Sequence, residues 1–388
     1  MNRISKKIQK FINLESSGGF FLLISAIIAM LWANTSPSTY NSFIHAKISM
    51  NIFGFVLDMT TESAVNDGLM SIFFLVVGIE LRSEIKEGSL SSIRNVSFPA
   101  IMAICGFVAP AVIYLTVTGF NPASIKGWAI PTATDIAFAM GALMIFGSRV
   151  PAGLKLALLA LAIIDDLLAI ITIAIFYTSD INTHYLLLSA SVLIAMLIIS
   201  KILKVRATGV YMIMGVLLWA FTLKSGIHAT LAGIALAFIL PYKGVDKDPR
   251  SPAKIVEQSC HSYVSFLIVP LFTICNAGIY ILDIGFKDIT NPVTIGVGFG
   301  LLLGKVIGIS GSAFLMNKFN VVKFPKNVTF PMIVGMSFLG AIGFTMALFV
   351  GALSGQNPVY YKAGIVCASI LAALLGYIAL DKSLPKKQ

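Results

Sequence analysis

Charged residues are scarce in this chain. Only 12% of its 388 residues are Asp, Glu, Lys or Arg, whereas a typical soluble domain has about 25%. Hydrophobic residues make up 57% of the sequence, and most of them lie in long apolar runs. This composition excludes a soluble globular protein, and it predicts an all-α, polytopic membrane protein.

Cysteine is also rare, and the signatures of common enzyme classes are missing. The four cysteines have no paired spacing, so we interpret them as free thiols rather than a disulfide or metal site: Cys105, Cys260, Cys275 and Cys367. The sequence contains no HExxH motif, P-loop or Rossmann fingerprint. We therefore expect neither an enzyme nor a cofactor.

The apolar runs predict about twelve transmembrane helices within a single transporter domain over residues 1–388. A spanning helix needs about 20 apolar residues. The predicted spans are 18–34, 61–81, 96–117, 127–147, 154–177, 185–203, 208–223, 227–242, 262–281, 292–314, 329–351 and 362–380.

The positive charges predict the orientation of these spans. With both termini in the cytoplasm most lysines and arginines fall inside, and the exceptions are Lys305 within a span and five outer lysines: Lys47, Lys126, Lys224, Lys287 and Lys362. This asymmetry follows the positive-inside rule. It also accounts for the net charge of +11 without a nucleic-acid partner.

One outer segment has a different pattern. Residues 46–60, "AKISMNIFGFVLDMT", alternate loosely between polar and apolar side chains, with a turn signal at "NIFG". This pattern predicts a small external β-hairpin.

Six ionisable residues within the predicted spans are candidates for a function inside the membrane: Asp67, Glu80, Asp135, Asp165, Asp166 and Lys305. A charge at the centre of a membrane helix costs about 3 kcal/mol on insertion scales, so such groups usually mark a transport pathway. Glu80 and Asp67 can also be structural or reach the interface. The adjacent Asp165 and Asp166 lie roughly 17 Å from either end of their helix, too far to reach surface water.

Two of the spans carry signals for a helix break. Pro131 removes an amide donor and clashes with the preceding turn, which predicts a break near residues 132–134. In the eleventh span the signals are Gly335, Gly340, Gly343 and Thr345. Interrupted helices in both halves of a chain are typical of transporters with inverted repeats. Spans three to five and ten to twelve, residues 96–177 and 292–380, would be these repeats.

A broken helix exposes amide and carbonyl ends with opposite partial charges. Asp135 follows the first break and is placed either to neutralise amide ends or to bind an ion. Lys305 is placed to neutralise carbonyl ends or to pair with an aspartate.

Three rival classes also use membrane carboxylates or broken helices. A sodium-coupled solute transporter needs a larger pocket, and a channel carries current without obligatory proton exchange. An intramembrane aspartyl protease places its aspartates on two helices with a GxGD signature, which this sequence lacks.

Five ordered motifs resemble one family. The segments "PTATDIAFAMGAL", "LALAIIDDLLAI", "LKSGIHATLAG", "LLLGKVIGI" and "IGFTMALF" are similar to those of NhaA-type sodium/proton antiporters. The resemblance covers residues 10 to 380. It implies twelve spans with crossed broken helices four and eleven, a bacterial inner membrane, and a homodimer formed through the hairpin.

The resemblance also implies roles for individual residues. It assigns Na⁺ or Li⁺ and proton binding to Asp165 and Asp166, with Thr134 and Asp135 nearby, and it makes Lys305 the partner of Asp165. Control by pH is implied for a second set: Glu80, Glu84, Lys254, Glu257, His261 and His228. The chain departs from the family's pattern at Ser83, where an arginine is usual, and at Gln258, where a histidine is usual.

Carboxylate chemistry suggests the mechanism. Na⁺ and Li⁺ prefer oxygen ligands, and a desolvated carboxylate holds a proton or a cation more readily than neither. Competition for the same oxygens is then the exchange step. We expect Asp166 to bind the cation, Asp165 to alternate between Lys305 and the proton or cation, and the pair to titrate together. If both release protons for each cation, the exchange is electrogenic and supports sodium and pH homeostasis.

Overall fold

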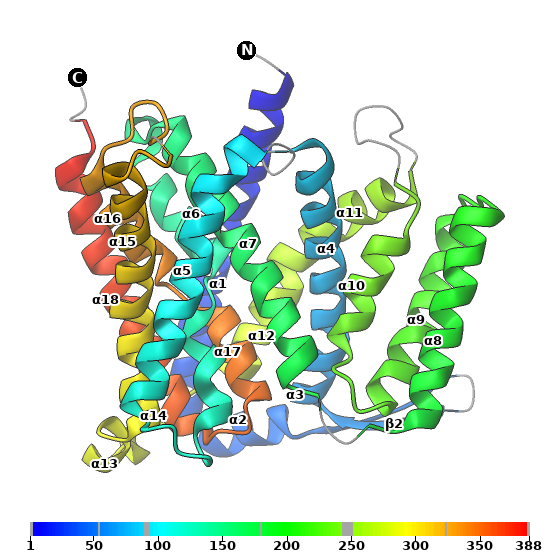
Figure 1. Cartoon of the computed structure of the whole chain (residues 1–388). Coiled ribbons are helices and arrows are strands. Elements are labelled where there is room, and N and C mark those ends of the chain that lie inside the picture. The colour runs from blue at the N-terminus through cyan, green and yellow to red at the C-terminus, as the bar shows by residue number, and fades with distance from the viewer. Residues whose placement is uncertain are drawn as a thin grey trace. The chain divides into compact units, whose positions relative to one another are not determined.

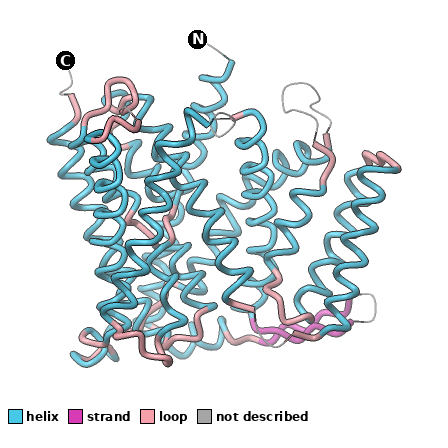
Figure 2. The backbone as a smooth tube through the Cα atoms, viewed as in Figure 1, coloured by secondary structure: helices cyan, strands magenta, loops and turns pink. Residues whose placement is uncertain are grey.

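The computed structural model describes residues 3–52, 55–88, 93–178, 181–242, 251–322 and 324–385. Helices make up most of this part of the chain, and its one sheet is a two-stranded hairpin (Figure 2). The chain forms two compact units. The first unit comprises Met1–Thr35, Ser92–Ala169 and Ala277–Gln388, and the second comprises Ser36–Ser91 and Ile170–Asn276.

The first unit contains both ends of the chain. Its elements are α1 (Arg3–Thr35), α5 (Ile93–Val117), η3 (Ile125–Thr132), α6 (Ile136–Met144), η4 (Gly147–Arg149), α7 (Ala152–Phe176, to residue 169), η7 (Ile281–Asp283), α13 (Phe286–Ile289), α14 (Pro292–Phe299), η8 (Gly300–Gly304), α15 (Lys305–Lys318), α16 (Phe330–Gly340), α17 (Phe344–Leu353) and α18 (Pro358–Ser383).

The second unit contains the middle of the chain and the hairpin. Its elements, besides the last turns of α7, are α2 (Pro37–Ile44), β1 (Lys47–Ile52), β2 (Phe55–Thr60), α3 (Thr61–Ser63), η1 (Ala64–Leu69), α4 (Met70–Glu87), α8 (Thr183–Leu197), η5 (Ile198–Ile202), α9 (Thr208–Lys224), α10 (Thr230–Ile239), α11 (Pro252–Tyr263), η6 (Val264–Ile268) and α12 (Val269–Asn276). In this unit α8 packs beside α9, and α4 beside α10 (Figure 1).

Eight helical stretches of the described chain are long and apolar enough to cross a membrane: Gly18–Thr35, Thr61–Glu87, Val96–Val117, Ala152–Phe176, Thr183–Ile202, Pro252–Asn276, Pro292–Lys318 and Pro358–Ser383. The bent pair α16 and α17 is a ninth candidate. In lipid a helix satisfies its own backbone groups, which explains why apolar runs of this length fold this way. The prediction of a helical, multi-pass membrane protein is confirmed at this level.

Besides this bent pair, three predicted spans have a different form from the others. The span predicted at 127–147 divides into η3 and α6, and those at 208–223 and 227–242 correspond to the shorter apolar helices α9 and α10. The predicted hairpin is confirmed: β1 and β2 are antiparallel, with Lys47 opposite Thr60 and Ile52 opposite Phe55.

Helices α14 and α18 start at the same short sequence, Asn-Pro-Val, in which the asparagine lies just before the first helical residue. Asn291 accepts a hydrogen bond from the amide of Val293 in α14, and Asn357 accepts one from the amide of Val359 in α18. Proline suits the first position of a helix because the amide it lacks has no partner there. The sequence thus sets the start of both helices, which pack together in the first unit.

Helix α5 lies directly against the backbone of η8 and α15. A Cβ atom added to Gly308 would lie 2.3 Å from the carbonyl oxygen of Cys105, and one added to Gly304 would lie 2.5 Å from Cα of Pro110. Small residues allow this close approach between membrane helices. Lys305 lies between these two glycines, and its side chain is fully buried. This packing fixes the position of Lys305 in the first unit.

Candidate functional site

A break in the helical path lies directly after Pro131. The turn η3 ends at Thr132, Ala133 and Asp135 have extended backbones, and α6 begins at Ile136. Proline provides no amide to continue the helix. The segment 133–135 is buried throughout, so its polar groups need partners from elsewhere in the protein.

A second break provides those partners. Helix α16 ends at Gly340, α17 begins at Phe344, and the two axes differ by 44°. The amide of Asp135 donates to the carbonyl of Ile342 at 2.7 Å. Two breaks that are far apart in the sequence therefore meet in the first unit.

Asp135 accepts hydrogen bonds from the starts of two helices. Its Oδ1 accepts from the amide of Phe138 at 3.1 Å, which caps α6. Its Oδ2 accepts from the amide of Thr345 at 3.0 Å and from the hydroxyl of the same residue, which caps α17. One buried carboxylate thus faces the positive ends of two helices, the arrangement that the helix dipole favours.

Asp165 forms a buried ion pair with Lys305. Both side chains are almost completely buried, at 1% and 0% exposure. Lys305 Nζ donates to Asp165 Oδ2. The hydroxyl oxygen of Thr134, in the first break, lies 2.6 Å from the same Oδ2. A residue on α7, one on α15 and one in the broken segment therefore meet at a single carboxylate oxygen.

The other oxygen of Asp165 has a different environment. Asp165 Oδ1 is buried and has no hydrogen-bond partner among the described residues. Asp166, the next residue on α7, is 3% exposed. A buried carboxylate oxygen without a donor is costly in an apolar interior, so this atom is placed to receive a proton or a cation.

The second unit holds a separate charged cluster. Glu80 Oε1 on α4 lies 3.1 Å from His261 Nδ1 at the end of α11, and Lys254 Nζ lies 2.5 Å from Glu257 Oε1. Both acids and both bases are partly buried. Glu84 lies one turn after Glu80 on α4. The structure thus brings together four of the residues that the sequence analysis assigned to pH control.

His228 lies away from that cluster. Its Nδ1 is 2.8 Å from the hydroxyl of Thr230, and its Nε2 is 3.6 Å from Oδ1 of Asp67. Asp67 and Glu80 belong to one continuous helical stretch, on which 13 residues span about 20 Å. His228 therefore pairs with the other intramembrane acid of this stretch.

The two departures from the family's pattern have simple surroundings. Ser83 accepts a hydrogen bond from the hydroxyl of Tyr242 at 3.2 Å. Gln258 is exposed on α11.

Sequence reasoning missed two kinds of polar group in and near these sites. Backbone carbonyls are one kind: Gly340 O lies 2.7 Å from the hydroxyl oxygen of Thr134. The buried Arg82 is the other, because it follows directly after the apolar run of the span predicted at 61–81. The charge of Arg82 beside that run was the available signal.

The described residues contain no group of three or more His, Cys, Asp and Glu side chains placed to hold a metal ion. The four cysteines are free thiols, as predicted.

Comparison with known proteins identifies the family. The family model for Na⁺/H⁺ antiporter 1 matches residues 9–380. A Na⁺/H⁺ antiporter NhaA of Escherichia coli O1:K1 is 41% identical over 96% of this chain and 97% of its own length. The NhaA proteins of Vibrio cholerae serotype O1 (strain M66-2) and Aliivibrio fischeri (strain MJ11) are 42% and 43% identical over 99% of this chain and 100% of theirs. The chain therefore belongs to the Na⁺/H⁺ antiporter 1 family, whose members are membrane transporters and not enzymes.

Proposed function

We propose that this sodium/proton antiporter exchanges cytoplasmic Na⁺ or Li⁺ for external protons at Asp165 and Asp166. The observation that carries the proposal is the buried Asp165–Lys305 pair beside two helix breaks, with one oxygen of Asp165 lacking a hydrogen-bond partner among the described residues. Hard alkali cations prefer oxygen ligands, and this place in the first unit offers carboxylate, hydroxyl and carbonyl oxygens together.

The exchange follows from competition for Asp165. A proton or a cation on this carboxylate replaces the charge compensation that Lys305 supplies. Because a buried carboxylate charge without a partner is strongly disfavoured, Asp165 holds Lys305, a proton or a cation at every step. Asp166 holds the cation next to Asp165. When two protons leave for each cation, the transport is electrogenic.

The hydrogen bonds of Thr134 change with the protonation of Asp165. Its hydroxyl oxygen lies within hydrogen-bond distance of both Asp165 Oδ2 and Gly340 O, but a hydroxyl has only one hydrogen to donate. A protonated Asp165 donates to Thr134, which then donates to Gly340. An ionised Asp165 takes the hydrogen for itself and leaves the Gly340 carbonyl for a cation.

The architecture we propose is one transporter domain with twelve spans. Residues 96–177 and 292–380 form inverted repeats, and the broken spans four and eleven cross at Asp135. Supporting this, each repeat has its break in the middle segment, between α5 and α7 in one and between α15 and α18 in the other. Spans four, seven and eight are then η3 with α6, α9 and α10.

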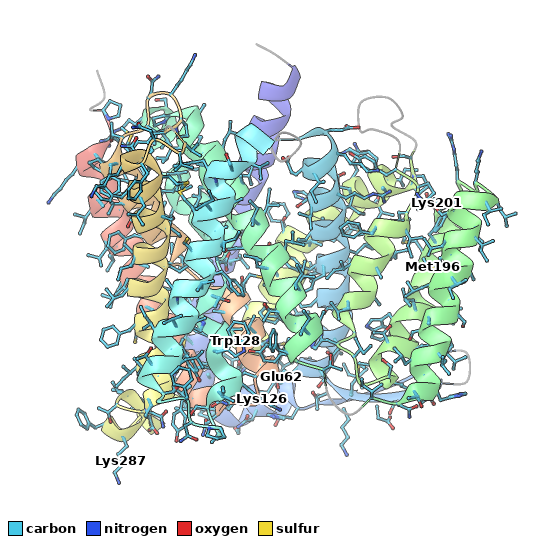
Figure 3. All side chains as sticks on the ribbon, in the orientation of Figure 1. Glu62, Lys126, Trp128, Met196, Lys201 and Lys287 are labelled. Atoms are coloured by element: carbon cyan, nitrogen blue, oxygen red, sulfur yellow. The ribbon has the colours of Figure 1, made fainter. Side chains whose placement is uncertain are left out.

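We propose a bacterial inner-membrane location with both termini in the cytoplasm. Within the first unit, the starts of α1 and the end of α18 lie at one end, marked N and C in Figure 1. Lys126 and Lys287, two of the predicted outer lysines, lie at the other end of this unit (Figure 3). The orientation itself rests on the excess of lysines and arginines in the predicted inner loops.

We further propose that the cluster of the second unit regulates exchange by pH. Glu80, Glu84, Lys254, Glu257 and His261 would carry this response, and His228 would contribute through Asp67. The protein would act as a homodimer joined through its hairpin.

The test is Na⁺-dependent proton movement in inverted membrane vesicles. Asp166→Asn should abolish it, because a neutral amide cannot hold a proton or balance the charge of a cation, while gel filtration shows a folded protein. The matched control is Asp288→Asn, since asparagine keeps the oxygen with which Asp288 caps Gly285. Near-normal exchange by Asp166→Asn would contradict the site.

Two further measurements separate the rival classes. Exchange in proteoliposomes without any organic solute excludes a sodium-coupled solute transporter. Electrical recording that shows current only with a proton gradient or counter-ion excludes a channel.

A further inference from the structure

Arg82 is a buried cation outside both the proposed exchange site and the pH cluster. It lies on α4, and its side chain is 7% exposed. Its Nη1 donates to the carbonyl of Ala237 at 2.9 Å and to that of Leu240 at 2.7 Å. Helix geometry leaves the last carbonyls of α10 without partners. Arg82 therefore caps α10 from a neighbouring helix, at the negative end of its dipole.

An aromatic ring completes the surroundings of Arg82. The guanidinium carbon lies 5.2 Å from the ring centre of Tyr242, and Lys86 Nζ lies 5.3 Å from the same ring. Such cation–π contacts are favourable where water is excluded. Two further charged residues, Lys201 of η5 and Glu87 of α4, interact electrostatically with Lys86.

Helices α4 and α10 are packed backbone to backbone. A Cβ atom added to Gly233 of α10 would lie 2.1 Å from the carbonyl oxygen of Ser71 on α4, and one added to Gly78 of α4 would lie 2.7 Å from Cβ of Ala237. The two helices lie side by side in Figure 1. Arg82 thus lies at one end of this interface, whose close contacts leave the two helices little freedom to slide past each other.

Glu80 lies on the opposite side of α4. Two residues along a helix point about 200° apart, so when Arg82 faces α10, Glu80 faces away from it. Glu80 contacts His261 and lies near Glu257 and Lys254, and all three belong to α11. Any rotation of α4 about its axis would move Glu80 relative to His261.

We propose that Arg82 is a positioning residue for the pH response: by capping α10 it fixes the rotation of α4 and holds Glu80 against His261. The inference rests on the proposed function, because it assigns a role to the cluster that regulates exchange. Arg82, a basic residue two positions after Glu80, thus binds carbonyl oxygens in this chain. Position 83, where an arginine is usual in the family, is a serine that accepts a hydrogen bond from the hydroxyl of Tyr242.

The experiment measures exchange in inverted vesicles from pH 6 to 9. Arg82→Gln should shift the pH of half-maximal activity by about half a unit or more, in the same direction as Glu80→Gln. Arg82→Lys should shift it less, because its ammonium reaches one carbonyl but lacks the planar fork. In the Glu80→Gln background, Arg82→Gln should cause no further shift.

The control is Ser83→Ala, which removes the contact with Tyr242 but leaves both carbonyl bonds of Arg82, and it should keep the original profile. The proposal is overturned if Arg82→Gln keeps that profile, or if its shift is equally large without Glu80. If Arg82→Gln does not fold, Arg82→Lys is the deciding variant, and an unchanged pH of half-maximal activity would overturn the proposal. Absence of any exchange by the unmodified protein would instead refute the proposed function.

Discussion

Single buried groups set the chemistry of this protein, and the ion pair between Asp165 and Lys305 is the clearest case. The sequence indicates both residues, because each is a charge in an apolar run and the motifs around them resemble the antiporter family. It does not indicate the oxygens of Gly340 or Ile342 that complete the site. Backbone carbonyls occur at every position, so only the folded breaks reveal which of them lack a helical partner.

Removing Lys305 should destabilise the protein in a pH-dependent way. Lys305→Ala leaves the Asp165 carboxylate buried without its cation, which typically costs about 3–5 kcal/mol. The loss should be largest at pH 9 and smaller at pH 6, because protonation of Asp165 removes the uncompensated charge. Thermal unfolding in detergent at both pH values measures this. Lys318→Ala, at the exposed end of α15, is the control, and an equal loss at both pH values would argue against the pairing.

The hydroxyl of Thr134 should matter more than its size. Thr134→Val keeps the shape but has no hydrogen to donate, so we expect weaker apparent Na⁺ affinity, by about tenfold for the loss of a hydrogen bond to a charged group. Thr134→Ser keeps the hydroxyl and should retain most of the affinity. The measurement is the Na⁺ concentration for half-maximal exchange at pH 8.5. Equal values for the two variants would show that the hydroxyl is not used.

Among whole elements, the sequence indicates long helices well and short or irregular ones poorly. Helices such as α7 follow from an uninterrupted apolar run. The ten residues of α10 are fewer than the usual length of a span. At its end, Arg82 and Ser200 donate hydrogen bonds to its last carbonyls. The turn η8, beside Lys305, also has no signature in the spacing of apolar residues.

The contact between α5 and α15 gives a matched pair of glycine variants. Gly308→Ala should destabilise the protein by about 1–3 kcal/mol through overpacking, since its Cβ would lie 2.3 Å from the carbonyl oxygen of Cys105. Gly311→Ala, on the same helix, should have little effect because nothing lies within 4 Å of its added Cβ. Melting temperatures of the two purified variants check this. Similar melting temperatures of the two variants would mean that α5 moves enough to make room for the added methyl group.

For the whole molecule, the family and the membrane class follow from sequence alone, and the comparisons confirm both. Assembly is less accessible to sequence reasoning. The hairpin forms a sheet of only two strands in the described chain, and such a sheet is marginally stable by itself and has open edges. These properties are the physical reason to expect that it pairs with a second copy.

Replacing residues 49–58 with a short glycine–serine linker should convert a dimer into a monomer. The measurement is the mass of the detergent-purified protein by light scattering. Lys287→Ala, at an exposed position of α13, is the control and should leave the mass unchanged. A variant that stays fully dimeric would show that the hairpin is not the main interface.

The double cap at Asp135 also determines when the site can first exist during synthesis. The carboxylate lies in the first half of the chain, but two of its donors belong to Thr345. A nascent chain that ends before Thr345 contains Asp135 without these two donors. The nascent transporter therefore keeps an incomplete polar centre inside the bilayer until translation is nearly finished, and any machinery that inspects half-made membrane proteins meets it in that state.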